Sequence, residues 1–178
     1  KEKGQHVFEP NKKMSDPALR KAIGYALDNE QVANETYQGL RIAANTLLSP
    51  FFGEIYADKS EVPGFTYNPE ESKKILADAG YKDTDGDGYV EDKDGKQLTI
   101  TLLAPAGSQT DDAVIQQYIE WWKNVGLRVE LLNGRALEFN SYAEKLTKYA
   151  DDFDMWLGGF TIGYNPDPDG LYGPIARF

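Results

Sequence analysis

The segment DTDGDGYVEDKD, from Asp83 to Asp94, has the residue types and spacing of a calcium-binding loop. Asp83, Asp85 and Asp87 alternate along the chain, so their carboxylates can point inward as the backbone curls around one ion. Gly88 falls at the sixth position, where such a loop must turn sharply. A hard cation that takes about six to eight oxygen ligands needs this spacing, and we therefore expect calcium as a structural ion.

The remaining expected ligands come from the second half of the loop. Tyr89 stands at the seventh position, where a backbone carbonyl suffices, and Glu91 at the ninth, which often binds through water. The twelfth position holds Asp94, where the EF-hand pattern has Glu. Because Asp is one methylene shorter, we expect a weak site, with a dissociation constant of about 10⁻⁴–10⁻³ M. An acidic, glycine-rich turn without a metal is the alternative interpretation.

A second polar segment, FTIGYNPDPDG at residues 160–170, follows the end of an expected strand. It contains Tyr164, Asn165, Asp167 and Asp169. Ligands of α/β proteins bind at the carboxyl ends of strands. We therefore interpret this segment as a ligand-binding loop.

The composition excludes several kinds of site. The 178 residues include no cysteine, so neither a disulfide framework nor a thiolate metal site is possible. The one histidine, His6, is near the start, which argues against a zinc site or a Ser-His-Asp triad. The net charge of −10 makes nucleic acid an unsuitable partner, because phosphate binding needs a basic face. No run approaches the roughly 18 apolar residues of a membrane helix.

Hydrophobic spacing and capping residues predict alternating helices and strands. Ser15, Asp16 and Pro17 are a helix start, as is Asn68 with the proline that follows it. We expect further helices at 30–37, 110–124 and 136–149, a long irregular segment at 40–68, and strands at 98–104, 127–132 and 152–160. Strand, helix, strand, helix, strand in this order predicts an α/β fold with parallel pairing.

Four segments resemble the C-terminal lobe of the peptide-binding proteins of bacterial ABC importers, the oligopeptide, dipeptide and nickel class of extracytoplasmic solute-binding proteins. They are DPALRKAIGYALDNEQVANETYQGLRIAANTLLSP, YNPEESKKILADAGY with the DxDGDG loop after it, WWKNVGLRVEL with the helix before it, and DMWLGGFTIGYNPDPDGLYG. The matches run from about residue 12 to 173 in the family's order.

The resemblance implies a type II, peptide-binding periplasmic-binding-protein-like fold with a mixed sheet flanked by helices. Residues 1–178 would be a single α/β lobe, excised from a larger two-lobed protein. In that family two lobes close over an extended peptide whose backbone pairs with a strand, and Gly159, Phe160 and Thr161 would supply this contact here. The resemblance also implies a monomer without catalysis that delivers oligopeptides to an ABC permease. It would be extracytoplasmic, either a lipoprotein at the outer face of the cytoplasmic membrane or periplasmic.

The chain departs from the family where relatives carry an Asp that pairs with the ligand's α-ammonium. Gly163 or Tyr164 stands at the matching position, and neither supplies the charge. A buried ammonium needs a charged partner, so we expect Asp167 or Asp169 to take this role through a shifted loop. The basic residues that bind the carboxylate of short peptides in some relatives have no counterpart at Leu157–Gly158, which favours longer ligands.

Two other classes of function stay open. The first is a calcium-stapled extracellular adhesion or scaffold module without a small ligand. The second is a hydrolase that uses paired carboxylates, as glycosidases do, with Asp111–Asp112, Asp151–Asp152 and Asp167/Asp169 as the candidate pairs. The first two pairs also have structural explanations, since the first lies in the first turn of an expected helix and the second in a turn.

Overall fold

The computed structural model describes residues 12–44, 46, 48–57, 60–62, 64–148 and 150–159. The chain divides into two compact units, Lys1–Ile42 with Phe65–Gly158, and Ala43–Gly64 with Gly159–Phe178. The larger unit contains every strand of the described residues. Among the described residues of the smaller unit is the 3-10 helix η3 (Pro50–Ile55). The expectation of a single lobe at 1–178 stays a prediction.

The sheet of the larger unit has three strands in the order β2-β1-β3. Strand β1 (Thr99–Leu103) pairs in parallel with β2 (Arg128–Leu131), with Ile100 opposite Val129, and with β3 (Met155–Trp156). The α/β fold class is therefore confirmed. The sheet is not mixed within the described residues, because both of its strand pairs are parallel.

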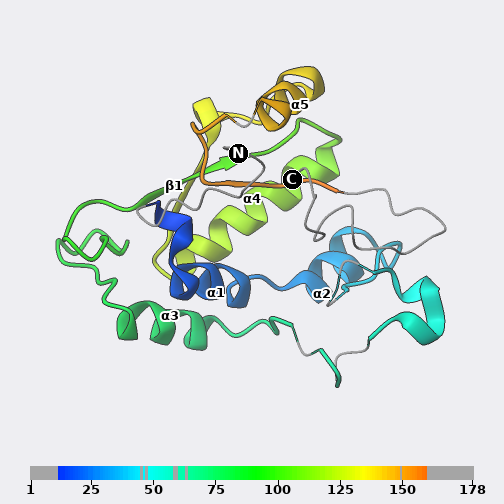
Figure 1. Cartoon of the computed structure of the whole chain (residues 1–178), viewed down its shortest axis with the longest axis horizontal. Helices are drawn as coiled ribbons and strands as arrows, with labels where there is room; N and C mark the ends of the chain where they lie inside the picture. Colours follow the sequence, from blue (N-terminus) through cyan, green and yellow to red (C-terminus); the bar gives the residue numbers. More distant parts are fainter. Residues whose placement is uncertain are drawn as a thin grey trace, which may run out of the picture. The chain divides into compact units, whose positions relative to one another are not determined.

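Helices cover both faces of this sheet. Ile100 and Leu102 of β1 join a buried cluster with side chains from α1 (Pro17–Tyr25), α3 (Pro69–Asp78) and α4 (Gln109–Asn124). Leu103 points to the other face and packs in a second cluster with Tyr142 of α5 (Phe139–Thr147). Figure 1 shows α5, in yellow and orange, on the opposite side of β1 from α1 and α4. The alternation along β1 thus gives the sheet two buried faces.

Capping side chains fix the helix starts, as the sequence predicts. Asp16 accepts a hydrogen bond from the Ala18 N–H before α1, and Asn68 accepts one from the Glu71 N–H before α3. Ser108 and Asp111 form a reciprocal capping box at the start of α4. These three helices begin within about two residues of where their sequence signals place them.

The helix expected at 30–37 has a different form. A short helix, α2 (Asn29–Gln31), continues directly into the π-helical turn η2 (Val32–Thr36). The segment ends at Gln38 and Gly39, which have φ values of +52° and +76°. Periodicity of apolar residues does not distinguish a π-turn from an α-helix over so few residues.

Two boundaries near the carboxyl ends of the strands are also corrected. The helix expected from residue 136 begins at Phe139, because Leu137 forms a parallel bridge with Pro105, just after β1, and is followed by the cap Glu138. Within its described part, residues 152–159, the strand expected at 152–160 is Met155–Trp156 only. Asp152 lies in a bend, and Asp154 caps the start of the strand pair by accepting a hydrogen bond from the Thr101 N–H at 2.8 Å.

Short 3-10 turns complete the described part, at η1 (Lys13–Ser15) and η4 (Leu132–Gly134). The irregular segment expected at 40–68 contains large apolar side chains that are exposed, since Phe51 is 91% exposed and Phe65 is 53% exposed. None of the helices in the described ranges has the length and apolar character needed to span a bilayer.

Candidate functional site

The acidic loop brings four carboxylates together. One oxygen each from Asp83, Asp85, Asp87 and Glu91 lies within 4.8 Å of the others. Four like charges at this separation repel one another by about 1 kcal/mol for each pair even at the dielectric constant of water. An oxygen-only donor set of this kind fits a hard divalent cation such as calcium.

Hydrogen bonds within the loop hold the aspartates in place. Both oxygens of Asp83 accept backbone N–H groups, from Gly86 at 2.7 Å and from Gly88 at 3.0 Å. Asp85 accepts from the Asp87 N–H, and Asp87 accepts from the Tyr89 N–H. Gly88 has a φ of +90°, a conformation that L side chains rarely adopt, and this explains the glycine at the sixth position.

Glu91 differs from the three aspartates because it is buried, with 7% of its surface exposed. Its carboxylate accepts hydrogen bonds from the Thr84 N–H and hydroxyl, both at 2.6 Å. Its backbone forms antiparallel bridges with Lys82 and with Gln97, on either side of the loop. Glu91 therefore closes the loop from both sides and presents its carboxylate to the cluster.

Asp94 does not join the cluster in the structure. It lies in a separate turn, where its N–H donates to Asp92 Oδ1 at 2.9 Å, and the Lys96 N–H donates to the same oxygen. The backbone returns toward the sheet after Glu91, so the twelfth position is used for a turn. The geometry assembles four of the expected metal residues as a carboxylate group and leaves Asp94 outside it. Tyr89, whose carbonyl the sequence predicts as a ligand, belongs to the same loop.

The core holds the loop through Asp16 at the start of α1. Lys93 Nζ lies 2.7 Å from Asp16 Oδ2, and the Tyr81 hydroxyl donates to the same oxygen at 2.8 Å. Burial by itself would raise the pKa of Asp16, but the bonds from Lys93, Tyr81 and the Ala18 N–H hold that pKa below its usual value. Because the folded-state pKa is lowered, this contribution to stability is complete above the unfolded pKa and is lost as the pH falls through the folded pKa.

Two further contacts join the loop to the turn between α4 and β2. The Val90 N–H donates to the Gly126 carbonyl at 2.8 Å, and a Cβ on Gly126 would lie 3.3 Å from Val90 Cγ1. Arg128, the first residue of β2, pairs with Asp87 and lies 4.2 Å from the centre of the Tyr89 ring. Sequence reasoning missed Arg128, because it is distant in sequence from the loop and carries no motif of its own.

Of the residues predicted to contact a ligand, the structure describes Gly159. Phe160, Thr161, Tyr164, Asn165, Asp167 and Asp169 lie outside the described residues, as does His6. The residues between β3 and Gly159 are held in place by hydrogen bonds. The Leu157 N–H donates to the Leu103 carbonyl, and the buried Tyr142 hydroxyl donates to the Leu157 carbonyl at 3.0 Å. The end of β3 is therefore fixed against β1 and α5 up to Gly158.

One carboxylate of each described pair that was considered for hydrolysis has a structural partner. Asp111 accepts hydrogen bonds from the Tyr37 hydroxyl at 2.8 Å and from Ser108, which together lower the pKa of Asp111. Burial and the bond to Asp111 raise the pKa of Tyr37. Asp152 pairs with Lys145 of α5. These contacts give Asp111 and Asp152 structural roles, so a catalytic role is not needed to explain them.

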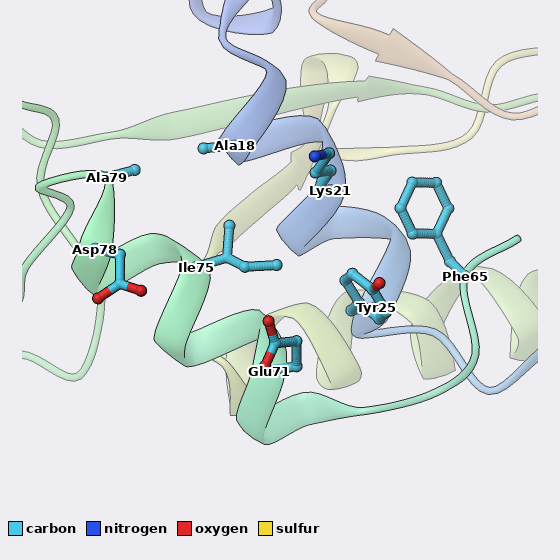
Figure 2. A pocket seen from close by; sticks show the side chains of 8 residues that line it. All are labelled: Ala18, Lys21, Tyr25, Phe65, Glu71, Ile75, Asp78 and Ala79. Carbon is cyan, nitrogen blue, oxygen red and sulfur yellow. The ribbon is translucent and has the colours of Figure 1, made fainter.

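A pocket that the sequence did not predict lies between α1 and α3. Its volume is about 480 Å³, and Figure 2 shows its lining residues Lys21 and Tyr25 on α1 and Glu71, Ile75 and Asp78 on α3, with Phe65 at one end. The Tyr25 and Phe65 rings meet edge to face, with centroids 5.2 Å apart. The pocket contains residues of neither the acidic loop nor the predicted ligand segment.

Comparison with known proteins decides the family. Residues 4–176 match the family described as bacterial extracellular solute-binding proteins, family 5 Middle. The chain belongs to this family. It is also 33% identical over 168 residues to the oligopeptide-binding protein OppA of Lactococcus lactis subsp. cremoris, an alignment that covers 93% of the chain and 28% of that protein.

Solved structures of family members agree with this assignment. Lactococcal OppA, in its closed conformation with an endogenous peptide, matches with a TM-score of 0.87 and 30% identity, over 97% of this chain and 32% of that one. AppA of Bacillus subtilis in complex with a nonapeptide matches with a TM-score of 0.78 and 29% identity, and the match covers 91% of this chain and 31% of AppA. An oligopeptide-binding protein of Thermotoga maritima with bound mannohexaose matches with a TM-score of 0.77 and 33% identity, and the match covers 92% of this chain and 31% of that one. The chain thus spans about a third of the length of each relative.

The packing at Gly158 gives a testable expectation for the segment that leads to the ligand residues. A Cβ at Gly158 would lie 2.3 Å from Trp156 Cζ3 and 2.4 Å from the Tyr142 hydroxyl oxygen. We expect Gly158→Ala to lower the free energy of unfolding by about 1–3 kcal/mol through overpacking, measured by urea denaturation.

The neighbouring glycine is the matched control. No heavy atom of the described residues lies within 4 Å of a Cβ built on Gly159, so Gly159→Ala should change stability by less than about 0.5 kcal/mol. Equal effects of the two substitutions would show that the end of β3 is not packed as described.

Proposed function

We propose that this chain is part of an extracytoplasmic solute-binding protein that binds extended oligopeptides and delivers them to an ABC permease. The observation that carries the proposal is the family membership, together with about 30% identity to two oligopeptide-binding proteins whose structures contain peptides. The relatives named here give no support to an adhesion or scaffold role. Because the chain spans about a third of their length, the function belongs to the full-length protein.

The geometry of β3 suits backbone recognition. β3 is the last strand in the order β2-β1-β3 of the described residues, and it runs directly into Gly158 and Gly159. A peptide that pairs with the chain after β3 would be recognised through N–H and C=O groups that every peptide offers, which gives affinity without sequence preference. Gly159, Phe160 and Thr161 are the proposed pairing residues.

Charge recognition is assigned to the loop that follows. Tyr164 and Asn165 would contact the ligand, and Asp167 or Asp169 would pair with its α-ammonium, because a desolvated ammonium requires a counter-charge. Ligands longer than dipeptides fit the absence of a basic residue at Leu157–Gly158. We further propose that the protein is a monomer without catalytic activity, held outside the cytoplasmic membrane by a lipid anchor or free in the periplasm.

Native mass spectrometry of the full-length protein tests the peptide proposal. After exposure to a random peptide library, the protein should carry one peptide of several residues. Asp167→Asn and Asp169→Asn are compared separately and together: the single substitution that removes the ammonium's partner, and the double substitution, should weaken binding of free-amine peptides by about tenfold or more, with little effect on N-acetylated peptides.

The saccharide named for the Thermotoga relative provides the competing outcome. If the protein takes no peptide from the library but binds manno-oligosaccharides, the proposed ligand is a sugar and not a peptide. The family assignment would not change. Unchanged affinity of the double Asp variant for free-amine peptides would remove the role given to Asp167 and Asp169.

We also propose that the acidic loop binds one calcium ion with a structural role. Asp83, Asp85, Asp87 and Glu91 would supply carboxylate oxygens and Tyr89 a carbonyl. The fit rests on their mutual separations and on the buried position of Glu91, since a buried carboxylate is costly without a positive partner. Bound to the folded form, the ion would stabilise it by about 2.7 kcal/mol at a hundredfold excess over the dissociation constant.

Two single substitutions distinguish the carboxylate cluster from the twelve-residue sequence pattern. Asp85→Asn keeps an oxygen that can accept the Asp87 N–H but removes a charged ligand, so calcium affinity should fall about tenfold or more in calorimetry. Asp94→Asn removes a charge outside the cluster and should change affinity by less than about threefold. A larger loss for Asp94→Asn would restore Asp94 as a ligand, and no calcium binding by the native protein would leave a plain acidic turn.

A further inference from the structure

Two residues of the acidic loop, Asp87 and Tyr89, contact the guanidinium of Arg128. Its guanidinium donates to Asp87 Oδ2 and lies 4.2 Å from the centre of the Tyr89 ring. The Arg128 side chain is 23% exposed and that of Asp87 is 39% exposed, so water screens the pair only in part. The side chain thus brings a positive charge to a group of carboxylates that repel one another.

The hydrogen bonds of Asp87 show what a metal ion would have to displace. Asp87 Oδ1 accepts the Tyr89 N–H at 2.9 Å, and Oδ2 is paired with Arg128. The first bond belongs to the backbone of the loop, whereas the second comes from a long side chain that can move. Arg128 already offsets part of the negative charge of Asp87, and its guanidinium would repel a cation bound to the same carboxylate, so the two positive charges compete for Asp87.

Within the described part of the chain, one hydrogen-bond donor of the Arg128 side chain has no acceptor. Its Nε is buried and has no hydrogen-bond partner among the described residues. A buried donor without an acceptor raises the free energy of the state that contains it. The loop therefore holds Arg128 in a pose that is stabilised by Asp87 and Tyr89 and opposed by the desolvation of Nε.

We propose that Arg128 is a built-in cation that orders the acidic loop in the absence of metal and lowers its calcium affinity by competing for Asp87. This inference rests on the proposed calcium site and extends it, since it identifies the residue that sets the strength of that site. Calcium binding would release Arg128 from Asp87 while the backbone bonds of the loop stay in place.

The test uses the full-length protein and compares two substitutions of the same residue. Arg128→Gln removes the charge, so calcium should bind about three- to tenfold tighter in calorimetry, and the metal-free protein should unfold at a lower temperature. Arg128→Lys keeps the charge and should bind within about twofold of the native protein. Lys145→Gln is the matched control, because Lys145 and Asp152 form an ion pair of similar exposure away from the loop, and calcium affinity should not change.

A second variant keeps the charge and loosens its attachment. Tyr89→Leu removes the ring beneath the guanidinium and keeps the backbone carbonyl of residue 89, so affinity should rise by about twofold to fivefold. It serves as the test if Arg128→Gln fails to fold.

The outcomes separate this inference from the calcium proposal. Unchanged or weaker binding by Arg128→Gln, or by Tyr89→Leu if it is the variant used, overturns the competition and makes Arg128 a supporting residue of the loop. Binding by Arg128→Gln alone upholds the competition but contradicts calcium binding by the native protein. If neither the native protein nor the variant binds calcium, both proposals fail.

Discussion

Strand β1 is paired on both edges and covered on both faces, and the larger unit depends on it. Its parallel partners β2 and β3 bring their carboxyl ends to the same edge of the sheet as its own. Ile100 and Leu102 are buried against α1, α3 and α4, while Leu103 is buried against α5. The direction of β3, and hence the place where the chain enters the predicted ligand segment, follows from this pairing.

The acidic loop occupies the connection between α3 and β1, so it controls how the central strand begins. Three contacts tie the loop to the core: Lys93 to Asp16 at the start of α1, Val90 to Gly126 after α4, and Arg128 of β2 to Asp87. Glu91 closes the loop against Gln97, two residues before β1. The loop is therefore coupled to three elements of the core, and an ion bound in it would act on the whole unit.

The sequence predicts those features that depend on neighbouring residues. Asp16 and Asn68 cap helices because a cap bonds to a backbone N–H two or three positions away. The alternation of Asp83, Asp85 and Asp87 places them in one cluster for the same local reason. The α/β class follows from the order of these elements.

Features that depend on distant residues could not be predicted in this way. Arg128 meets Asp87 through the packing of β2 beside the loop, which no local spacing encodes. The bridge between Pro105 and Leu137 delays the start of α5, and the bond from Thr101 to the Asp154 side chain shortens β3. Asp94 is diverted into a turn because the chain must return to the sheet after Glu91.

Amide hydrogen exchange with calcium and with a chelator tests most directly whether the acidic loop is coupled to the central sheet. Ligand binding stabilises every amide whose exchange requires the opening of the ligand-bound structure. The coupling predicts slower exchange in calcium at β1 and β2 as well as in the loop. Protection confined to residues 83–95, with β1 and β2 unchanged, would contradict it.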